Sequence, residues 1–381
     1  MSSSVKRSSL KQSRFKVPSI KKLTESARFI NLHDRMFDSE SLVQAGKTPF
    51  TVVSDDIQEQ GLIKLRHYPA LEGFPTRHRV PVVIVAPLAI NMLVYDLFED
   101  RSLVRYLLEQ GFSVYMTDWG SPTREHSRYN FEEYVLNFLP KLLEQVRQHS
   151  RSQELSLHSW SMSGVFTLLY AAATKDPNIR NIIVLGTPVS AYLSGTNGAL
   201  FQRAGKAMNW IEQHTGFHPR TLPAGLLHSY GWANALGFKL LDIQGTLKGH
   251  LSMLRQLDNR AAVESHATHG AFLNHMVDYP GGINRDMLIK VWMDNGLAHG
   301  EFKIGGKIVY LKDIHAALLA GGGRSDTMVT IDAVRPLVDL VGSRDTTFAT
   351  LPGGHVSMIA SEAAAKEFWP ILGEWLAKRS D

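Results

Sequence analysis

Residues 157–164, Leu-His-Ser-Trp-Ser-Met-Ser-Gly, change from a strand pattern to a helix pattern within a few positions. An apolar run ends, one polar side chain projects at Ser161, and helical spacing of apolar residues begins at Met162. This context is typical of a nucleophile elbow, usually written G-x-S-x-G, in which the serine occupies a sharp turn. The positions two before and two after it must be small, and here both are serines, Ser159 and Ser163. The alternative is a cluster of helix N-caps, because Ser is favoured where a helix begins.

A nucleophilic serine needs a general base, and the base needs a carboxylate that orients it. In folds with this elbow, the acid and then the histidine follow the serine along the chain. Asp326 follows a predicted strand at residues 315–320, and His355 follows one at residues 347–351. Each lies just past the carboxyl end of its strand, where the sites of α/β proteins gather. We therefore predict a triad of Ser161, Asp326 and His355.

Three other groups bear on this site. The first backbone N–H of the predicted helix, at Met162, can donate to an oxyanion that develops beside Ser161. Asp332 is expected to begin or to lie on a helix, and Asp345 lies in a turn-like segment before the last strand. Both patterns are typical of surface or turn residues, and we keep Asp345 as the alternative to Asp326.

Away from the elbow, strand patterns alternate with helix patterns. Residues 80–86 form a continuous apolar run with β-branched side chains, which is typical of a strand buried on both faces of a parallel sheet. The alternation predicts a doubly wound, mostly parallel α/β sheet. The other predicted strands span residues 62–68, 112–116, 155–158, 181–185, 315–320 and 347–351, and the predicted helices span 97–110, 131–148, 162–174 and 361–378.

Charge and composition divide the chain of 381 residues. Residues 1–28 carry eight Lys and Arg and one Glu, a net charge of +7, whereas the whole chain has +5. We therefore expect a basic, flexible N-terminal extension over residues 1–55 and an α/β domain over 56–381, with a helical lid inserted at 190–305. Such an extension is typical of a solvated leader, and the alternatives are attachment to an anionic membrane, to a granule surface or to nucleic acid by electrostatics.

Composition excludes several classes of protein. An apolar share of 44% is enough for a folded core. The absence of Cys excludes a disulfide framework, a thiolate metal site and a Cys nucleophile, and it is consistent with a reducing compartment, so we expect a cytoplasmic protein. No apolar run approaches the ~20 residues of a membrane span. The basic extension lacks the interleaved aromatic residues of a single-strand groove, so we expect no nucleic-acid partner.

Cofactor motifs are also missing. No G-x-G-x-x-G follows the first buried strand, and the three glycines at residues 321–323 are not followed by the G-K-[ST] of a phosphate loop. His266 and His269 stand three apart with His275 nearby, but no thiolate or clear carboxylate set accompanies them. We therefore expect neither a cofactor nor a metal ion.

Further segments on both sides of the elbow carry a resemblance to a known family. These segments are residues 85–91 (VAPLAIN), 95–97 (YDL), 101–111 (RSLVRYLLEQG), 118–120 (DWG), 295–297 (NGL), 305–311 (GGKIVYL), 340–345 (LVGSRD) and 351–356 (LPGGHV). With the elbow, they resemble the poly(3-hydroxyalkanoate) synthases, most closely the class III catalytic subunits, from about Pro81 to the C-terminus. The resemblance implies an α/β-hydrolase fold and acyl transfer from a 3-hydroxyacyl-CoA.

The resemblance also assigns roles to single residues. Ser161 matches the nucleophile, Asp326 the acid and His355 the base. The loop at residues 88–91 would supply a second oxyanion donor, for which we expect the Ile90 amide.

Two departures from the family pattern concern the same site. The family nucleophile is Cys in a G-x-C-x-G box, whereas this chain has Ser161, and the family's His after the acid is replaced by Thr327. An acyl group on Ser is an ordinary ester rather than a thioester. Related α/β hydrolases that degrade these polyesters or cleave small esters use Ser.

We predict an enzyme that transfers (3-hydroxy)acyl groups from thioesters or esters through a covalent acyl-enzyme. The alternatives are an esterase, thioesterase or polyhydroxyalkanoate depolymerase with water as acceptor, and a non-catalytic relative that binds granules or a synthase. Candidate partners are an acyl-CoA or ester substrate, a polyester granule or anionic surface, and a second copy or partner synthase subunit. The aromatic residues of the insertion either line an acyl tunnel or pack within the lid: Trp210, Phe217, Tyr230, Trp232, Phe272 and Trp292.

Overall fold

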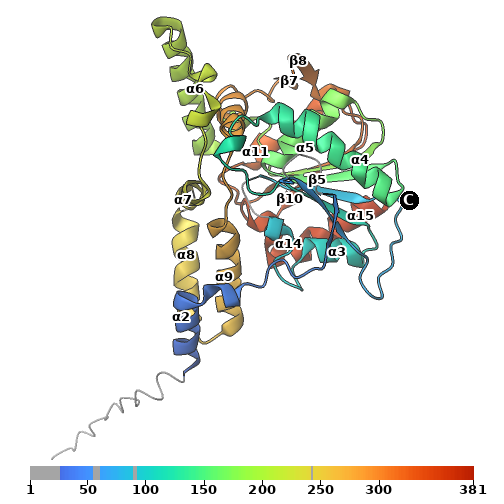
Figure 1. Cartoon of the computed structure of the whole chain (residues 1–381), viewed down its shortest axis with the longest axis vertical. Helices are drawn as coiled ribbons and strands as arrows, with labels where there is room; N and C mark the ends of the chain where they lie inside the picture. The colour runs from blue at the N-terminus through green and yellow to red at the C-terminus, as the bar shows by residue number, and fades with distance from the viewer. Residues whose placement is uncertain (1–25, 55–60, 89–91, 242) are drawn as a thin grey trace, which may run out of the picture.

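The computed structural model describes residues 26–54, 61–88, 92–241 and 243–381, and its centre is an eight-stranded sheet (Figure 1). The strand order is β1-β2-β4-β3-β5-β6-β9-β10. Neighbours from β4 to β10 are parallel, and β1 and β2 run antiparallel at one edge. The predicted doubly wound, mostly parallel sheet is therefore confirmed. The strands are β1 (Thr51–Ser54), β2 (Lys64–Tyr68), β3 (Val82–Val85), β4 (Val114–Asp118), β5 (Leu155–Trp160), β6 (Ile179–Leu185), β9 (Ala317–Gly323) and β10 (Thr346–Leu351).

Helices cover both faces of the sheet, and the central strands are buried between them (Figure 1). On β3, Val83 and Val85 belong to the core that contains α4 and α5, whereas Val82 and Ile84 belong to the core that contains α3 and α15. This two-sided burial explains why residues 80–86 form a continuous apolar run. The helices that flank the sheet are α3 (Leu103–Glu109), α4 (Leu139–Ser150), α5 (Met162–Thr174), α11 (Ile331–Val334), α12 (Leu337–Leu340), α13 (Ser357–Ala360), α14 (Glu362–Glu367) and α15 (Trp369–Ala377), and the π-helical turn Glu133–Phe138 precedes α4.

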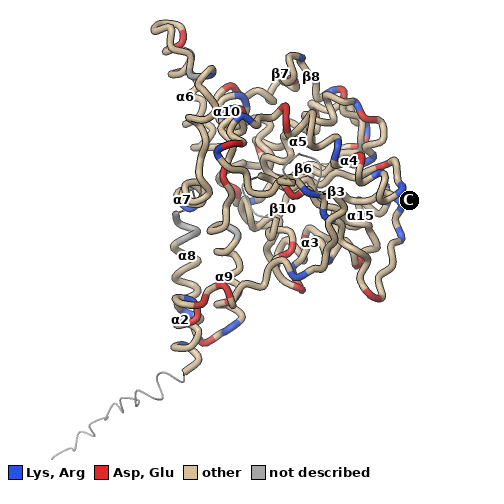
Figure 2. The backbone as a smooth tube through the Cα atoms, viewed as in Figure 1, with Lys and Arg blue, Asp and Glu red and all other residues tan. Residues whose placement is uncertain are grey.

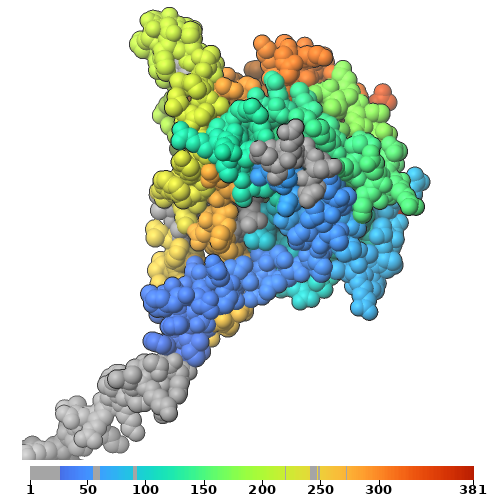
Figure 3. All heavy atoms as spheres, in the orientation of Figure 1, coloured from blue at the N-terminus to red at the C-terminus, as the bar shows by residue number. Residues whose placement is uncertain are grey.

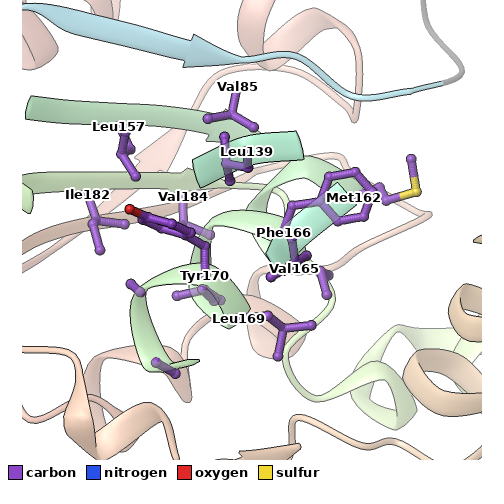
Figure 4. Close-up of a cluster of buried hydrophobic side chains, with 14 of the residues drawn as sticks. Val85, Leu139, Leu157, Met162, Val165, Phe166, Leu169, Tyr170, Ile182 and Val184 are labelled. Atoms are coloured by element: carbon purple, nitrogen blue, oxygen red, sulfur yellow. The ribbon is translucent and has the colours of Figure 1, made fainter. Parts of the chain in front are cut away.

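The packing of α5 fixes the position of the elbow. Leu157 and Val184 of the sheet lie in one buried cluster with Val165, Phe166 and Leu169 of α5 (Figure 4). Each such side chain contributes about 1.5–3 kcal/mol when it is fully buried. Because α5 is held against the sheet along its length, its first turn cannot move independently of β5.

The N-terminal part of the chain differs from the flexible extension expected over residues 1–55. α2 (Ala27–Phe37) packs on α9 and on the turn before it: Arg260 of α9 pairs with Asp34 at 2.6 Å, and the Asn31 amide donates to Leu257 O in the turn at 2.8 Å. β1 then pairs with β2 and forms the edge of the sheet. The basic residues at positions 1–28 led to the prediction of a flexible extension, although residues 27–37 also have the amphipathic pattern of a helix. Residues 1–25, which carry most of that charge, lie outside the described residues.

A long insertion leaves the sheet after β6 and returns at β9. Its helices α6 to α9 form a column beside the sheet, with α2 at one end of the column (Figures 1 and 3). Charged residues mark the end of the column where α2 meets α9 (Figure 2). The elements are α6 (Gly195–Thr215), α7 (Gly231–Leu241), α8 (Ile243–Arg255), α9 (Arg260–Asn274), α10 (Gly281–Arg285), the π-helical turn Asp286–Met293 and the hairpin of β7 (Glu301–Ile304) with β8 (Lys307–Tyr310).

Most aromatic residues of the insertion neither line a tunnel nor pack inside it. Trp210 and Trp232 are 58% and 71% exposed, and Phe217 and Tyr230 are also exposed. Only Trp292 among the described side chains of this set is buried, and its ring lies 4.9 Å from that of Phe201. The side chain of Phe272 lies outside the described part. Over the described residues, no helix has the length and hydropathy to cross a membrane.

Candidate active site

Ser161 occupies the turn between β5 and α5, as the sequence predicts. Its φ of 59° and ψ of −126° lie in a sparsely populated region that costs about 1–3 kcal/mol for a residue with a side chain. Two hydrogen bonds hold this backbone: Ser161 N–H donates to Leu185 O, and Thr187 Oγ1 donates to Ser161 O, each at 2.8 Å. A Cβ at Gly164 would collide with the Thr187 side chain, so this glycine lets α5 approach β6 closely.

The serines on either side of Ser161 do more than provide small side chains. Ser159 Oγ donates to Ile183 O at 2.8 Å. Ser163 Oγ donates to Trp160 O at 2.9 Å and accepts from Trp160 N–H at 3.0 Å. Both serines are fully buried. Their hydroxyls therefore take part in closing the turn.

His355 lies beside Ser161 although 194 residues separate them. Its Nε2 is 2.9 Å from Ser161 Oγ, so the hydroxyl can donate to the imidazole. The loop that carries His355 follows β10 and turns at Gly353, whose φ is +83°. A side chain at Gly353 would be strained, and its Cβ would collide with Ser357 Oγ.

Asp326 holds the other side of the imidazole. His355 Nδ1–H donates to Asp326 Oδ2 at 2.7 Å. The second carboxylate oxygen accepts the backbone N–H groups of Met328 and Val329, each at 2.9 Å. The carboxylate is fully buried, so these bonds fix its orientation and, through it, the tautomer of His355 that leaves Nε2 free to accept.

The alternative carboxylates lie elsewhere. Asp345 is half exposed and makes two 2.8 Å hydrogen bonds to the Arg379 guanidinium, which lower the pKa of Asp345. Asp345 lies just before the first residue of β10, whereas His355 follows the last residue of the same strand, so the two residues lie at opposite ends of β10. Asp332 is exposed in the first turn of α11.

One of the two predicted oxyanion donors is described. Met162 is the first residue of α5, so its N–H has no acceptor within the helix. This N–H belongs to the first turn of α5 and directly follows Ser161 in the chain. Ile90, for which we predicted the second donor, lies outside the described residues.

The histidines that raised the question of a metal site have other hydrogen-bond partners. Within the described ranges, no group of three or more His, Cys, Asp or Glu could hold a metal ion. His266 accepts a hydrogen bond from Arg35 at 3.3 Å, and His269 donates to Ser265 O at 2.7 Å. A cavity of about 600 Å³ is lined by Glu132 and by residues of the insertion, among them Phe302, and none of the three triad residues borders it.

Behind the site lies a buried group that sequence reasoning did not identify. Trp160 is fully buried, and its ring centroid lies 5.2 Å from that of His355 at an interplanar angle of 39°. His158, two residues earlier on the same face of β5, is fully buried, and burial lowers its pKa to about 4. Its ring meets that of Tyr95 edge to face at 5.8 Å. These contacts depend on tertiary packing, and the only signal in the sequence was an aromatic residue next to Ser161.

Comparisons with known proteins show which proteins this chain resembles. No family model matches the chain. The poly(3-hydroxyalkanoate) polymerase subunit PhaC of Haloferax mediterranei is 28% identical over 90% of this chain and 67% of its own length. That of Allochromatium vinosum is 27% identical over 85% of this chain and 88% of its own. This chain resembles the poly(3-hydroxyalkanoate) polymerases.

The fold has relatives among solved structures. A soluble variant of monoglyceride lipase from Saccharomyces cerevisiae has a TM-score of 0.57 and 12% identity, covering 89% of this chain and 97% of that one. The chain therefore has the α/β-hydrolase fold, and with the polymerases as its relatives it is an enzyme. The resemblance expected from the elbow and the flanking segments is confirmed.

Proposed function

We propose that the protein is a synthase-like acyltransferase that carries 3-hydroxyacyl groups as an ester on Ser161. The observation that supports this proposal most directly is the hydrogen-bonded series Asp326–His355–Ser161 beside the first turn of α5. The polymerase relatives support the class of acyl group and of reaction.

In the proposed first half-reaction, Ser161 Oγ attacks the carbonyl carbon of a 3-hydroxyacyl thioester. Its proton passes to His355 Nε2, and Asp326 stabilises the imidazolium that forms. The negative oxygen of the tetrahedral intermediate accepts from Met162 N–H. The carbon–sulfur bond then breaks, and the thiolate leaves with the proton from His355. The products are the free thiol of CoA and an ester on Ser161.

In the second half-reaction, the hydroxyl of another hydroxyacyl group attacks the ester on Ser161. His355 takes the proton of this hydroxyl and returns it to Ser161 Oγ when the carbon–oxygen bond of the enzyme ester breaks. An ester is exchanged for an ester, so a polyester chain can grow by one unit. Such a ping-pong cycle uses the same three side chains twice.

Hydrolysis is the second candidate function. The observation that favours it is the hydroxyl nucleophile, because an oxygen ester on Ser161 can be cleaved by water as in esterases. The protein would then be an esterase, thioesterase or polyester depolymerase. A non-catalytic granule- or synthase-binding role is a weaker alternative, since it needs none of the three hydrogen-bonded side chains.

One experiment separates these functions. Purified full-length protein is incubated with 3-hydroxybutyryl-CoA and longer homologues, and free CoA and polymer are measured separately. We expect CoA and polymer together from the wild type and neither from Ser161→Ala. CoA without polymer would support the thioesterase, and no CoA from any homologue would contradict the proposed acyl donor.

A further inference from the structure

Within the described residues, the ring of Trp160 is the aromatic surface that meets the ring of the proposed general base. Trp160 is the last residue of β5 and directly precedes Ser161. Its side chain is fully buried, and its ring centroid lies 5.2 Å from that of His355. His355 is itself only 9% exposed. The two rings therefore meet where little water separates them.

We propose that Trp160 is a positioning residue whose π-electron surface stabilises the positive charge that His355 acquires during acyl transfer. The proposal rests on the proposed function, because it requires His355 to take the proton of Ser161. It assigns a role in the reaction to a residue outside the Ser161–His355–Asp326 series.

The physical basis is the attraction of a cation to an aromatic face. Indole is the strongest of the natural aromatic partners, and the attraction acts within about 6 Å of the ring centroid. It is larger in a buried site than in water, since the effective dielectric constant is lower. The distance between Trp160 and His355 falls within this range.

The step at which His355 becomes positively charged decides which kinetic constant Trp160 can change. His355 is neutral when it accepts the hydrogen bond from Ser161 and positive only while it holds the transferred proton. An interaction that strengthens in the transition state raises kcat rather than substrate binding. Trp160 should therefore act on kcat and leave KM nearly unchanged.

The other groups that face the imidazole do not duplicate this effect. Asp326 supplies the negative charge at Nδ1 on the opposite side of the ring from Ser161. His158 is on the same face of β5 as Trp160, and its pKa of about 4 keeps it neutral above that pH. The Trp160 Nε1–H has no acceptor within the described residues, so packing alone holds the indole in place.

The test compares Trp160→Phe and Trp160→Leu with the control Trp369→Leu. Trp369 is buried in the same core, but its ring lies 5.6 Å from Tyr106 and not beside His355. CoA release is measured between pH 5 and 9. We expect Trp160→Leu to lower kcat about tenfold, to leave KM within about twofold, and to move the acidic limb of kcat/KM downward by about one pH unit, which corresponds to about 1.4 kcal/mol.

Two comparisons separate this effect from loss of packing. Trp160→Phe keeps an aromatic face and should lose less than about threefold in kcat. Trp369→Leu should lower the melting temperature without moving the pH limb. An acidic limb that stays in place in both Trp160 variants while kcat falls would show a structural role and overturn the inference.

A second readout does not depend on turnover. In the Ser161→Ala background, the ring signals of His355 are followed by NMR as a function of pH, with Trp160 intact or replaced by Leu or Phe. The signals are assigned by their loss in His355→Gln. We expect the titration midpoint to fall in the order Trp, Phe, Leu, and three equal midpoints would overturn the inference. Failure of the proposed function would appear separately, as full CoA release by Ser161→Ala.

Discussion

At the scale of single residues, the three serines of the elbow hold different bonds. Ser163→Ala removes the acceptor of the buried Trp160 N–H and should destabilise the fold by about 1–3 kcal/mol. Ser159→Ala loses only a donor to a carbonyl and should cost less. Ser161→Ala should hardly change stability but abolish CoA release. Urea unfolding with activity measurements gives both rankings, and equal stability of Ser163→Ala and wild type would contradict the bonding at the turn.

The carboxylates give the second prediction. Asp326→Asn should keep the fold and lower kcat by ~10⁴, by analogy with the orienting carboxylate of serine proteases. Asp345→Asn is the matched control, since it removes a half-exposed pair with Arg379 that contributes about 0–1 kcal/mol. Steady-state rates of both variants test the assignment. The opposite ranking would show that Asp345 is the acid.

Burial of His158 predicts a pH dependence of stability. Its pKa falls from 6.5 to about 4 in the folded protein, so the unfolded chain binds the proton first as the pH drops. The contribution is fully present above pH 6.5 and is lost towards pH 4, by about 3 kcal/mol. His158→Phe, which keeps a ring against Tyr95, should remove this part of the acid sensitivity. Urea unfolding at pH 7 and pH 4.5 measures the difference between the two proteins.

At the scale of elements, the residues at which helices begin, end or divide follow local signals in the sequence. α5 spans the predicted residues 162–174, because strand and helix patterns meet without a linker. The predicted helix at 361–378 divides at Phe368, because Pro370 lies in the first turn of α15. The hairpin of β7 and β8 was not predicted, although Gly305-Gly306 between alternating residues is a turn signal.

The site shows which interactions a sequence can reveal. Strand ends and chain order were enough to predict the neighbours Ser161, Asp326 and His355, because parallel strands bring their carboxyl ends to one edge. The contacts of Thr187 with the elbow and of Trp160 with His355 depend on side-chain directions in the folded core. No spacing along the chain encodes such contacts.

Two glycines with positive φ give a prediction at this scale. Gly353→Ala and Gly306→Ala introduce a side chain at φ of +83° and +72°, and each should cost about 1 kcal/mol of stability. A Cβ at Gly306 meets open space, whereas one at Gly353 collides with Ser357 in the loop that carries His355. Only Gly353→Ala should therefore lower kcat as well. Equal activity of both variants would show that the loop tolerates the shift.

At the scale of the whole molecule, apolar side chains remain exposed along the column of the insertion. Trp232, Leu236 and Leu240 follow one another at helical spacing on α7 and are 50–71% exposed. Leu247, Leu251 and Leu254 continue this pattern on α8. This exposure departs from the usual arrangement, because amphipathic helices normally pack with their apolar face inward. The column therefore exposes apolar side chains on both α7 and α8, and Leu254 lies next to the start of α2, where Arg28 donates to its carbonyl at 3.4 Å.

The segment before α2 and α2 itself are expected to have different roles, the first electrostatic and the second structural. Residues 1–25 carry seven Lys and Arg and one Glu, a net charge of +6, and end just before the Ser26 N-cap of α2. We propose that this segment attaches the protein to anionic surfaces, because each Lys or Arg near such a surface contributes about 1 kcal/mol. Deletion of residues 1–25 should preserve CoA release and stability but weaken binding to anionic lipid vesicles.

Salt and a longer deletion provide the controls. Binding of the full chain should fall as ionic strength rises, since charges are screened beyond about 8 Å at 0.15 M. Deletion of residues 1–38 also removes α2, with the Asp34–Arg260 pair that joins it to α9 and the Asn31–Leu257 bond to the turn before α9, and should lower the melting temperature. Equal vesicle binding by the full chain and the 1–25 deletion at low salt would rule out the attachment role. A lower melting temperature in the shorter deletion would instead place part of residues 1–25 in the folded body.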